Sequence, residues 1–276
     1  MYRNEDVVLA TTPLHLAASG GSFDIFKALV EIPGTTVDQM RKLLDARNEK
    51  RQTALHLASF NDNKNIIEYI VKMHIADPSI QDIRLQTPLH FAAESGSAEI
   101  TELLLQAKAN PVLQDYRGKT PVEIAARGNF VTVVDMIIKA ERVHSKLIES
   151  GSSDEVLKTM YFGRDINVGT EHMRKIIYKL ATRKFRRDEW TILARHWNYT
   201  ETHIKCIEEQ YIGKTGFKEH GYRFLLIWLF ECLVTQQNPI KEMYEGLVVI
   251  ERKDLAEQIR LLANTTPHHD SKCSIL

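Results

Sequence analysis

The sequence predicts an all-α protein in two parts, a solenoid of short helical repeats followed by a compact bundle of six helices. Three observations lead to this prediction. One short pattern recurs four times in the first half of the 276 residues. In the second half, apolar residues recur at helical spacing without the alternation of a strand. The composition is 43% hydrophobic and 26% charged, with 36 basic and 36 acidic residues, which is ordinary for a globular protein.

The recurring pattern predicts a pair of helices in each repeat. The four copies are residues 11–21, 52–62, 86–96 and 119–129, reading TTPLHLAASGG, QTALHLASFND, QTPLHFAAESG and KTPVEIAARGN. The threonine caps an inner helix, and proline is tolerated in the first turn because no hydrogen bond is lost there. Nine residues later the chain must turn left-handed before an outer helix. Glycine, asparagine and aspartate suit that turn, and they stand there as Gly21, Asp62, Gly96 and Asn129.

The spacing of the four copies departs from a strict period at one place. Their threonines, Thr12, Thr53, Thr87 and Thr120, are separated by 41, 34 and 33 residues. The extra residues of the first interval fall around 32–42, where we expect an enlarged loop. The first repeat also starts close to Met1 and leaves no room for the polar capping unit that terminal repeats normally need, as expected of a short isoform or a piece of a longer array.

A period near 33 residues with the pattern T-P-L-H-x-A-A resembles the ankyrin repeat, over roughly residues 8–140. The resemblance implies about four repeats with short hairpin loops and a protein-binding face. It also implies that His15, His56 and His90 fix loops through hydrogen bonds. A metal site is not expected of them, because zinc ligands must converge on one site and each of these histidines lies in a different repeat.

The second half predicts a linker, a bundle and a tail. We place the linker at residues 141–169, where the sequence becomes polar around 150–153. Six amphipathic helices follow, and helices of this length form a compact bundle. The predicted helices are 171–182, 188–197, one capped by Thr200, 222–235, one opened by Pro239, and 254–262.

Four strings in this half resemble the death domain, over residues 170–265, with a flexible tail at 266–276. They are W-x-x-L-A-x-x-W-N-Y-T at 190–200, I-x-x-I-E at 204–208, YRFLLIWL at 222–229 and KDLAEQIR at 253–260. The whole chain resembles the ankyrin-repeat and death-domain-containing protein family. The resemblance implies a non-catalytic adaptor or scaffold in intracellular signal transduction. It would bind one protein through the ankyrin face and another, a death-fold partner, through the death domain.

No catalytic motif is found, so we expect neither an enzyme nor a cofactor. Three cysteines, without a signal peptide, indicate a reducing compartment and a cytoplasmic protein. The last four residues, CSIL, match a prenylation motif at Cys273, although no polybasic segment precedes it. Three interpretations stay open: an unmodified tail, a PDZ ligand, or a prenylated protein that sequesters a partner at a membrane.

Two groups of residues are candidates for partner binding. Phe60 lies seven residues after Thr53, where the other repeats hold Ser19, Glu94 and Arg127. A position that is polar in three repeats is not expected to face the core. We therefore predict that Phe60 is an exposed anchor with Glu94 and Arg127 as its polar rim, the alternative being a singly exposed apolar residue.

The second group is the densest basic run in the chain, which holds Arg183, Lys184, Arg186 and Arg187 around Phe185. It is either a solvated connection between two helices or a charged surface for a partner. The resemblance favours a protein partner over nucleic acid, because death domains pair through surfaces of opposite charge.

Overall fold

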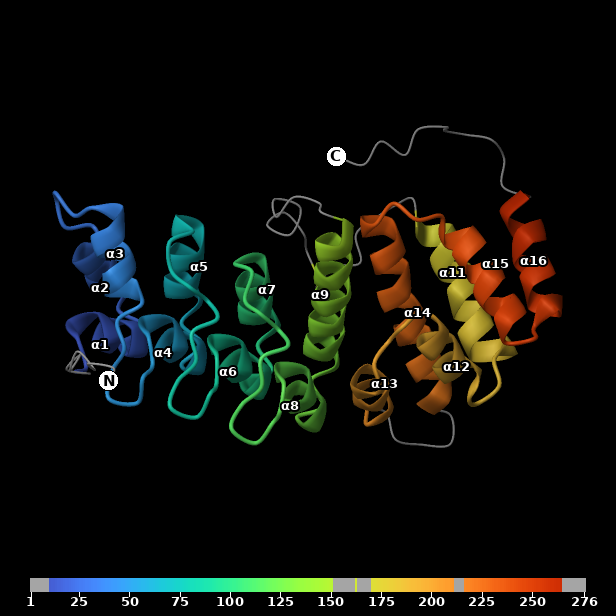
Figure 1. The fold of residues 1–276 in the computed structure, drawn as a ribbon, viewed down its shortest axis with the longest axis horizontal. Helices are drawn as coiled ribbons and strands as arrows, with labels where there is room; N and C mark the ends of the chain where they lie inside the picture. The colour runs from blue at the N-terminus through green and yellow to red at the C-terminus, as the bar shows by residue number, and fades with distance from the viewer. Residues whose placement is uncertain (1–9, 151–161, 163–169, 211–215, 265–276) are drawn as a thin grey trace, which may run out of the picture. The chain divides into compact units, whose positions relative to one another are not determined.

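The structure, a computed structural model, describes residues 10–150, 162, 170–210 and 216–264. The chain divides into two compact units, Met1–Asp165 and Ile166–Leu276. Every regular element in the described ranges is a helix (Figure 1), which confirms the predicted all-α class.

The first unit contains four pairs of helices, which lie in a row (Figure 1). The inner helices are α1 (Pro13–Gly20), α4 (Ala54–Phe60), α6 (Pro88–Ser95) and α8 (Pro121–Arg127). The outer helices are α2 (Phe23–Val30), α5 (Lys64–Met73), α7 (Ala98–Gln106) and α9 (Val131–Ser150). Each inner helix packs on the next inner helix, and each outer helix on the next outer helix. The predicted solenoid of about four repeats is therefore confirmed.

The ends of the inner helices are set by the residues that the pattern repeats. Each inner helix starts with a capping box, in which the threonine and the third helical residue exchange hydrogen bonds. The turn after each inner helix is left-handed, as predicted. Gly21, Asp62, Gly96 and Asn129 have φ angles of 68°, 57°, 71° and 57°.

The outer helices bury one apolar position per repeat, with an exception in the first. Ile66, Ile100 and Val133 occupy the same register and are 1%, 0% and 1% exposed. Ile25 holds that register in α2 and is 59% exposed. The core of the array therefore lies between successive repeats, because these residues become buried only when one repeat stacks on another.

The enlarged loop predicted around residues 32–42 is wrong, because most of this segment is a helix, α3 (Val37–Leu44). Its N-cap is Thr36, which forms a capping box with Gln39. Leu44 is buried at the end of the helix. Capping and one apolar anchor thus stabilise a helix where the repeat period alone suggested an irregular insertion.

The last helix of the array is longer than the repeat period requires. Residues 141–150, which the sequence analysis places in the linker, continue α9. Phe162 is buried in the same unit. Its N–H donates to Glu102 Oε1 at 2.7 Å, and its carbonyl oxygen accepts from Lys139 Nζ at 3.1 Å. These bonds attach residue 162 to α7 and α9.

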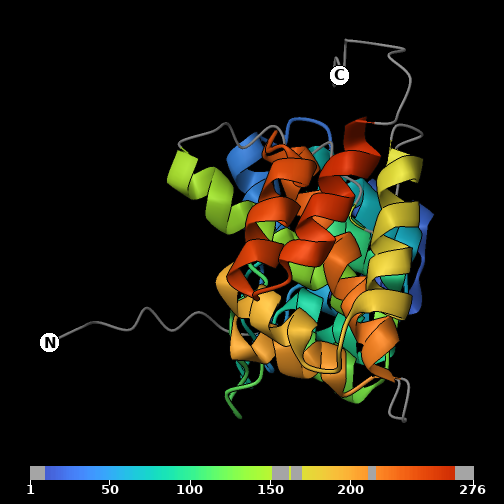
Figure 2. The ribbon, with the colours of Figure 1, turned by 90° about the vertical axis from the view of Figure 1, so that its right-hand side faces the viewer.

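The second unit is a helical bundle. Its helices are α11 (Glu171–Lys179), a π-helical turn η2 (Leu180–Lys184), α12 (Glu189–His196), α13 (Glu201–Glu208), α14 (Gly216–Val234), α15 (Pro239–Val249) and α16 (Lys253–Asn264). The neighbouring helices α15 and α16, coloured orange-red and red, face the viewer in Figure 2. Asn198 lies between α12 and α13 and has a left-handed φ of 60°.

Helix α14 forms the centre of the bundle and begins earlier than predicted. The helix predicted from residue 222 starts at Gly216, and Gly221 is buried inside it. A Cβ added to Gly221 would lie 3.5 Å from Trp190 Cβ and 3.7 Å from Ala181 Cβ. These are ordinary contact distances, so Gly221 is packed inside the bundle and does not end the helix.

Aromatic side chains fill the space around α14. Trp190 and Trp228 are 1% and 2% exposed. The Trp197 ring stacks on Trp228 with centroids 4.5 Å apart, and Phe224 lies against both Trp190 and Trp197. A Cβ on Gly246 would come within 2.7 Å of the Trp197 ring, so α15 approaches this cluster directly.

Candidate binding surfaces

Phe60, Glu94 and Arg127 lie at corresponding positions near the C-terminal ends of the inner helices α4, α6 and α8, and all three are exposed. Phe60 is 64% exposed. One edge of its ring meets Phe91 of the next repeat, with centroids 5.7 Å apart and the ring planes at 86°. The contact leaves most of the Phe60 surface open. Its exposure agrees with the sequence analysis, and its role in binding stays a prediction.

A second surface of the array was not identified from the sequence. Three tip loops, residues 48–53, 82–87 and 115–120, precede α4, α6 and α8 (Figure 1). In each loop a side-chain oxygen accepts two backbone N–H groups at 2.7–2.9 Å. The accepting residues are Asn48, Asp82 and Asp115. The three loops therefore share one conformation, and residues at equivalent positions of the loops are exposed.

The histidines connect each inner helix to the following loop. The backbone N–H of Thr53 donates to His56 Nδ1 at 3.1 Å, so that nitrogen is an acceptor. His56 Nε2 lies 3.1 Å from the carbonyl oxygen of Gln86 and must donate to it. The neutral Nε2–H tautomer is thus the form that satisfies both contacts.

The same arrangement recurs in two other repeats. His15 Nε2 contacts the carbonyl oxygen of Gln52 at 2.9 Å, and His90 Nε2 that of Lys119 at 3.2 Å. The expected loop-fixing role of the histidines is confirmed. Burial lowers the pKa of His15 and His90, and it lowers that of His56 to about 4. In the fourth repeat Glu123 replaces histidine in the capping box.

The basic segment, residues 183–187, begins in η2 and ends before α12. Arg183, Lys184, Arg186 and Arg187 are exposed, whereas Phe185 is 8% exposed and anchors the segment in the core. Among the described residues, these four cations form one ion pair with a carboxylate, from Arg186 Nε to Glu189 Oε1 at 3.8 Å. The segment is therefore a positively charged surface with a fixed backbone.

Two residues that sequence reasoning missed hold this backbone in place. Glu189 Oε2 accepts the N–H of Arg186 at 2.8 Å. Arg252 Nη1 donates to both Glu189 oxygens at 2.8 Å and to the carbonyl oxygen of Lys184 at 3.3 Å. Arg252 also pairs with Asp254, and hydrogen bonds to Asp254 and Glu189 raise the pKa of its guanidinium. No sequence signal could reveal this pair, because its partners are 63 residues apart.

Other features contribute no recognisable chemistry. Cys206 and Cys232 are buried thiols, and Cys273 lies outside the described residues. The described ranges contain no group of three His, Cys, Asp or Glu side chains placed to hold a metal ion. None of the described helices is long and apolar enough to cross a membrane.

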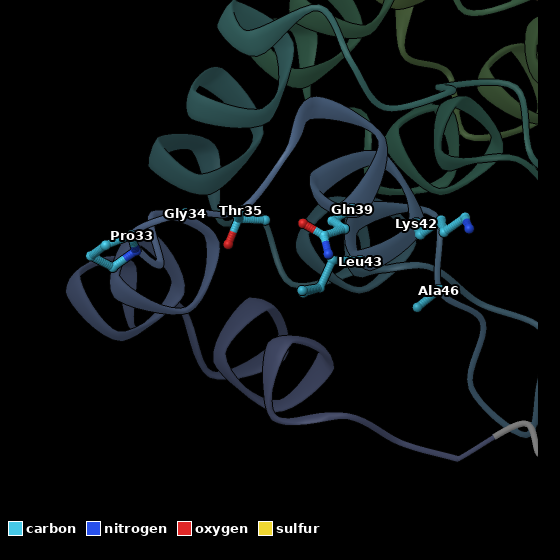
Figure 3. A pocket seen from close by; sticks show the side chains of 7 residues that line it. All are labelled: Pro33, Gly34, Thr35, Gln39, Lys42, Leu43 and Ala46. Carbon is cyan, nitrogen blue, oxygen red and sulfur yellow. The ribbon is translucent and has the colours of Figure 1, made fainter.

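The hollow beside α3 is lined by residues 33–35 and by Gln39, Lys42, Leu43 and Ala46 (Figure 3). Its volume is about 600 Å³ and it is widely open. The lining holds one charged group, Lys42, and Gln39 is already engaged in capping the helix. A small-molecule site normally needs several convergent polar groups in an enclosed cavity, so this hollow does not have the character of one.

Comparison with known families agrees with this architecture. Residues 3–82 and 70–146 match the family described as ankyrin repeats (3 copies), and residues 174–262 match the death domain. The two overlapping ankyrin matches run from residue 3 to residue 146, which is more than half of the 276 residues. Both resemblances found in the sequence are confirmed.

Curated relatives are similar over short stretches. Alpha-latroinsectotoxin-Lt1a of Latrodectus tredecimguttatus is 33% identical over 86 residues, 31% of this chain and 6% of the relative. Transient receptor potential cation channel subfamily A member 1 of Drosophila melanogaster is 31% identical over 99 residues, 36% of this chain and 8% of the relative. NF-kappa-B inhibitor alpha of Gallus gallus is 38% identical over 63 residues, 23% of this chain and 20% of the relative. The matches thus span a fifth or less of each of these relatives.

Proposed function

The chain belongs to the ankyrin-repeat family and carries a death domain, and from this premise we propose that it is a non-catalytic adaptor in signal transduction. It binds one protein through the ankyrin array and a second through the death domain. Both modules are protein-interaction modules. NF-kappa-B inhibitor alpha, which by its name acts on another protein, is similar over part of this chain and supports a protein partner here.

The observation that supports this proposal best is the division into two compact units, each with its own exposed side chains. The array presents Phe60, an exposed aromatic ring with one edge held by Phe91. Exposed aromatic residues often dominate binding energy, because they offer a large contact area and lose little side-chain entropy on association.

The death-domain unit presents a surface of a different character. The basic segment offers Arg183, Lys184, Arg186 and Arg187 on a backbone held by Glu189 and Arg252. A surface of this charge favours an acidic partner surface and speeds the encounter with it. We assign it to an acidic face of another death-fold domain.

The test compares two surface variants of the full chain in cells, using cross-linking and mass spectrometry to identify the bound proteins. Phe60→Ala should reduce capture of one set of proteins by about fivefold or more, which corresponds to the usual threshold of about 1 kcal/mol for a contributing residue. Arg183→Glu with Arg187→Glu should reduce capture of a different set. Loss of the same proteins in both variants, or of none in either, would contradict an adaptor with two separate surfaces.

A further inference from the structure

The three tip loops bring one cation from each of three successive repeats into the same register. Lys50, Arg84 and Arg117 each lie two residues after the side-chain acceptor of their loop, and all three are exposed. We call these residues the cation ladder. Neighbouring loops are joined directly: the N–H of Ile83 donates to the carbonyl oxygen of Lys50 at 3.0 Å, and the N–H of Tyr116 to that of Arg84 at 2.9 Å. The spacing of the ladder is therefore fixed by backbone hydrogen bonds.

The charges of the ladder are available to a partner. None of the three cations forms an ion pair with a carboxylate in the described ranges. The loop carboxylates of Asp82 and Asp115 are 2% and 7% exposed, and each is turned inward onto two backbone N–H groups. The outward side of the ladder thus carries three cations, with one exposed carboxylate beside them, that of Glu49 in the first loop.

Apolar side chains accompany the cations of the second and third loops. Ile83 and Tyr116, which directly precede Arg84 and Arg117, are 63% and 54% exposed. The Arg117 guanidinium lies 5.0 Å from the centroid of the Tyr116 ring, and its Nε donates to the Tyr116 hydroxyl at 2.6 Å. A ligand for this surface therefore needs negative charges and apolar groups in alternation.

Strained residues mark the same loops. Arg51 and Leu85 have positive φ angles of 59° and 57°, at the register where the fourth repeat has Gly118 with a φ of 72°. A side chain in this conformation costs free energy that glycine avoids. Leu85 is also 46% exposed, so burial in the array does not offset that cost.

We propose that the tip loops bind an extended acidic segment of a partner protein, with an acidic side chain at about every third residue. This deepens the proposed function and rests on it, because it names the chemistry of the protein bound by the ankyrin array. The carboxylates pair with Lys50, Arg84 and Arg117, and the residues between them cover Ile83, Leu85 and Tyr116.

The third-residue spacing follows from the geometry of the loops. The two arms of each loop are joined by a backbone hydrogen bond, as from the N–H of Asp82 to the carbonyl oxygen of Gln86, so each repeat adds two chain segments to the row. Segments paired in this way lie about 4.8 Å apart, so successive cations are roughly 10 Å apart. A peptide in the polyproline II conformation rises about 3.1 Å per residue with three residues per turn. Every third side chain then lies on one face, about 9 Å from the last, which matches the ladder.

A protein partner fits these loops better than a nucleic acid. The aliphatic side chains of Ile83 and Leu85 are exposed beside the cations and gain little from a phosphate backbone. Single-stranded nucleic acid is usually held by a continuous basic groove with aromatic platforms. The tip loops instead offer one described aromatic residue, Tyr116, and two aliphatic ones.

The experiment measures binding of fluorescent peptides to the purified full chain at low salt. The probe is a peptide with glutamate at every third position, alanine and leucine between, and the control peptide has the same composition with its glutamates adjacent. The spaced peptide should bind about tenfold more tightly than the clustered one, and the difference should fall as salt is raised. Equal affinities would overturn the proposal, because bulk charge alone would then explain binding.

Two protein variants with the same change in charge locate the site. Arg84→Glu should weaken binding of the spaced peptide about tenfold. Lys42→Glu, at an exposed position on α3 outside the ladder, should change it by less than about twofold. Equal effects of the two variants would overturn the proposal, and so would tighter binding of a single-stranded oligonucleotide than of the spaced peptide.

A third variant separates binding from folding. Leu85→Gly relieves the left-handed strain, so the melting temperature should stay the same or rise by a few degrees while affinity for the spaced peptide falls. A fall in melting temperature would show that Leu85 serves the fold and would overturn its assignment to the binding surface. If the spaced peptide fails to bind while Phe60→Ala still loses its cellular partner, the ladder is wrong and the adaptor proposal stands.

Discussion

His56 shows how one side chain can couple two repeats. Its Nδ1 closes the capping box of α4, and its Nε2 reaches the carbonyl oxygen of Gln86 at the start of the next inner helix. If Nδ1 were protonated, it could no longer accept the hydrogen bond from the N–H of Thr53. Burial further disfavours the charged ring, and the pKa of His56 falls from 6.5 to about 4.

This lowered pKa predicts a pH dependence of stability. Between pH 6.5 and about 4 the unfolded chain holds more protons on this residue than the folded chain does, so stability is full above pH 6.5 and is lost as the pH falls. The loss at pH 4 should be on the order of a few kcal/mol. Urea unfolding monitored by circular dichroism at several pH values measures it.

A matched variant identifies the source of that dependence. His56→Gln keeps a residue that can close the capping box and removes the titrating group. Its stability should therefore change less steeply between pH 6.5 and 4 than that of the native chain. An identical slope in the two proteins would mean that His56 does not carry the effect.

The contact between Arg252 and Glu189 predicts a second effect at the residue scale. The two side chains are 15% and 9% exposed, so removing one of them leaves a largely buried charge without its partner. Arg252→Ala should lower the free energy of unfolding of the death-domain unit by about 3 kcal/mol. Arg260→Ala removes an exposed ion pair of the same chemistry and should cost less than about 0.5 kcal/mol. Denaturant unfolding of both variants measures the difference, and equal costs would remove the bridging role assigned to Arg252.

At the scale of the helix, α14 determines whether the second unit folds. Trp228 is 2% exposed and stacks on Trp197, so truncation leaves a large cavity at the centre of the bundle. Trp228→Ala should cost about 3–5 kcal/mol, which is much of the stability of a small domain. The death-domain unit should unfold while the ankyrin unit keeps its own transition.

Thermal unfolding followed by circular dichroism, with limited proteolysis to assign each transition, checks this expectation. Ile192→Ala serves as the control, because Ile192 is 46% exposed on α12 and its truncation should cost less than about 0.5 kcal/mol. A melting profile unchanged by Trp228→Ala would be incompatible with this side chain supporting the core.

How much of each element the sequence predicted depends on how local its signal is. Capping threonines and the left-handed residues Gly21 and Asn198 act within one turn, so both ends of a helix can be read from a few neighbouring residues. The first turns of α14 were missed because Gly216 and Gly221 lower its local helix propensity, although both are buried in the folded bundle. Helix α3 was missed because the departure from the repeat period concealed the capping pair of Thr36 and Gln39.

The candidate binding surfaces were likewise predictable only where the sequence holds a local or repeated signal. The exposure of Phe60 could be inferred from the polar residues at its register in the other repeats. The cation ladder also has a register signal, since Lys50, Arg84 and Arg117 each stand three residues before the threonine of their repeat. The pairing of Glu189 with Arg252 has no such signal, because only the folded bundle brings the two together.

At the scale of the whole molecule, the chain contains two units that bury separate cores. The solenoid core forms between repeats, and the bundle core forms around the tryptophans of α12 and α14. Independent cores allow each surface to be altered without unfolding the other unit. The proposed adaptor function requires this property, since an adaptor must hold two proteins at the same time.

Formation of a ternary complex is therefore the most direct test of the account. The full chain is mixed with its ankyrin partner and its death-domain partner, as identified by cross-linking, and the masses of the complexes are measured by light scattering. We predict a complex of all three proteins. The Phe60→Ala variant should form a complex with the death-domain partner alone. The double variant Arg183→Glu and Arg187→Glu should form a complex with the ankyrin partner alone. Mutually exclusive binding of the two partners to the native chain would contradict the account.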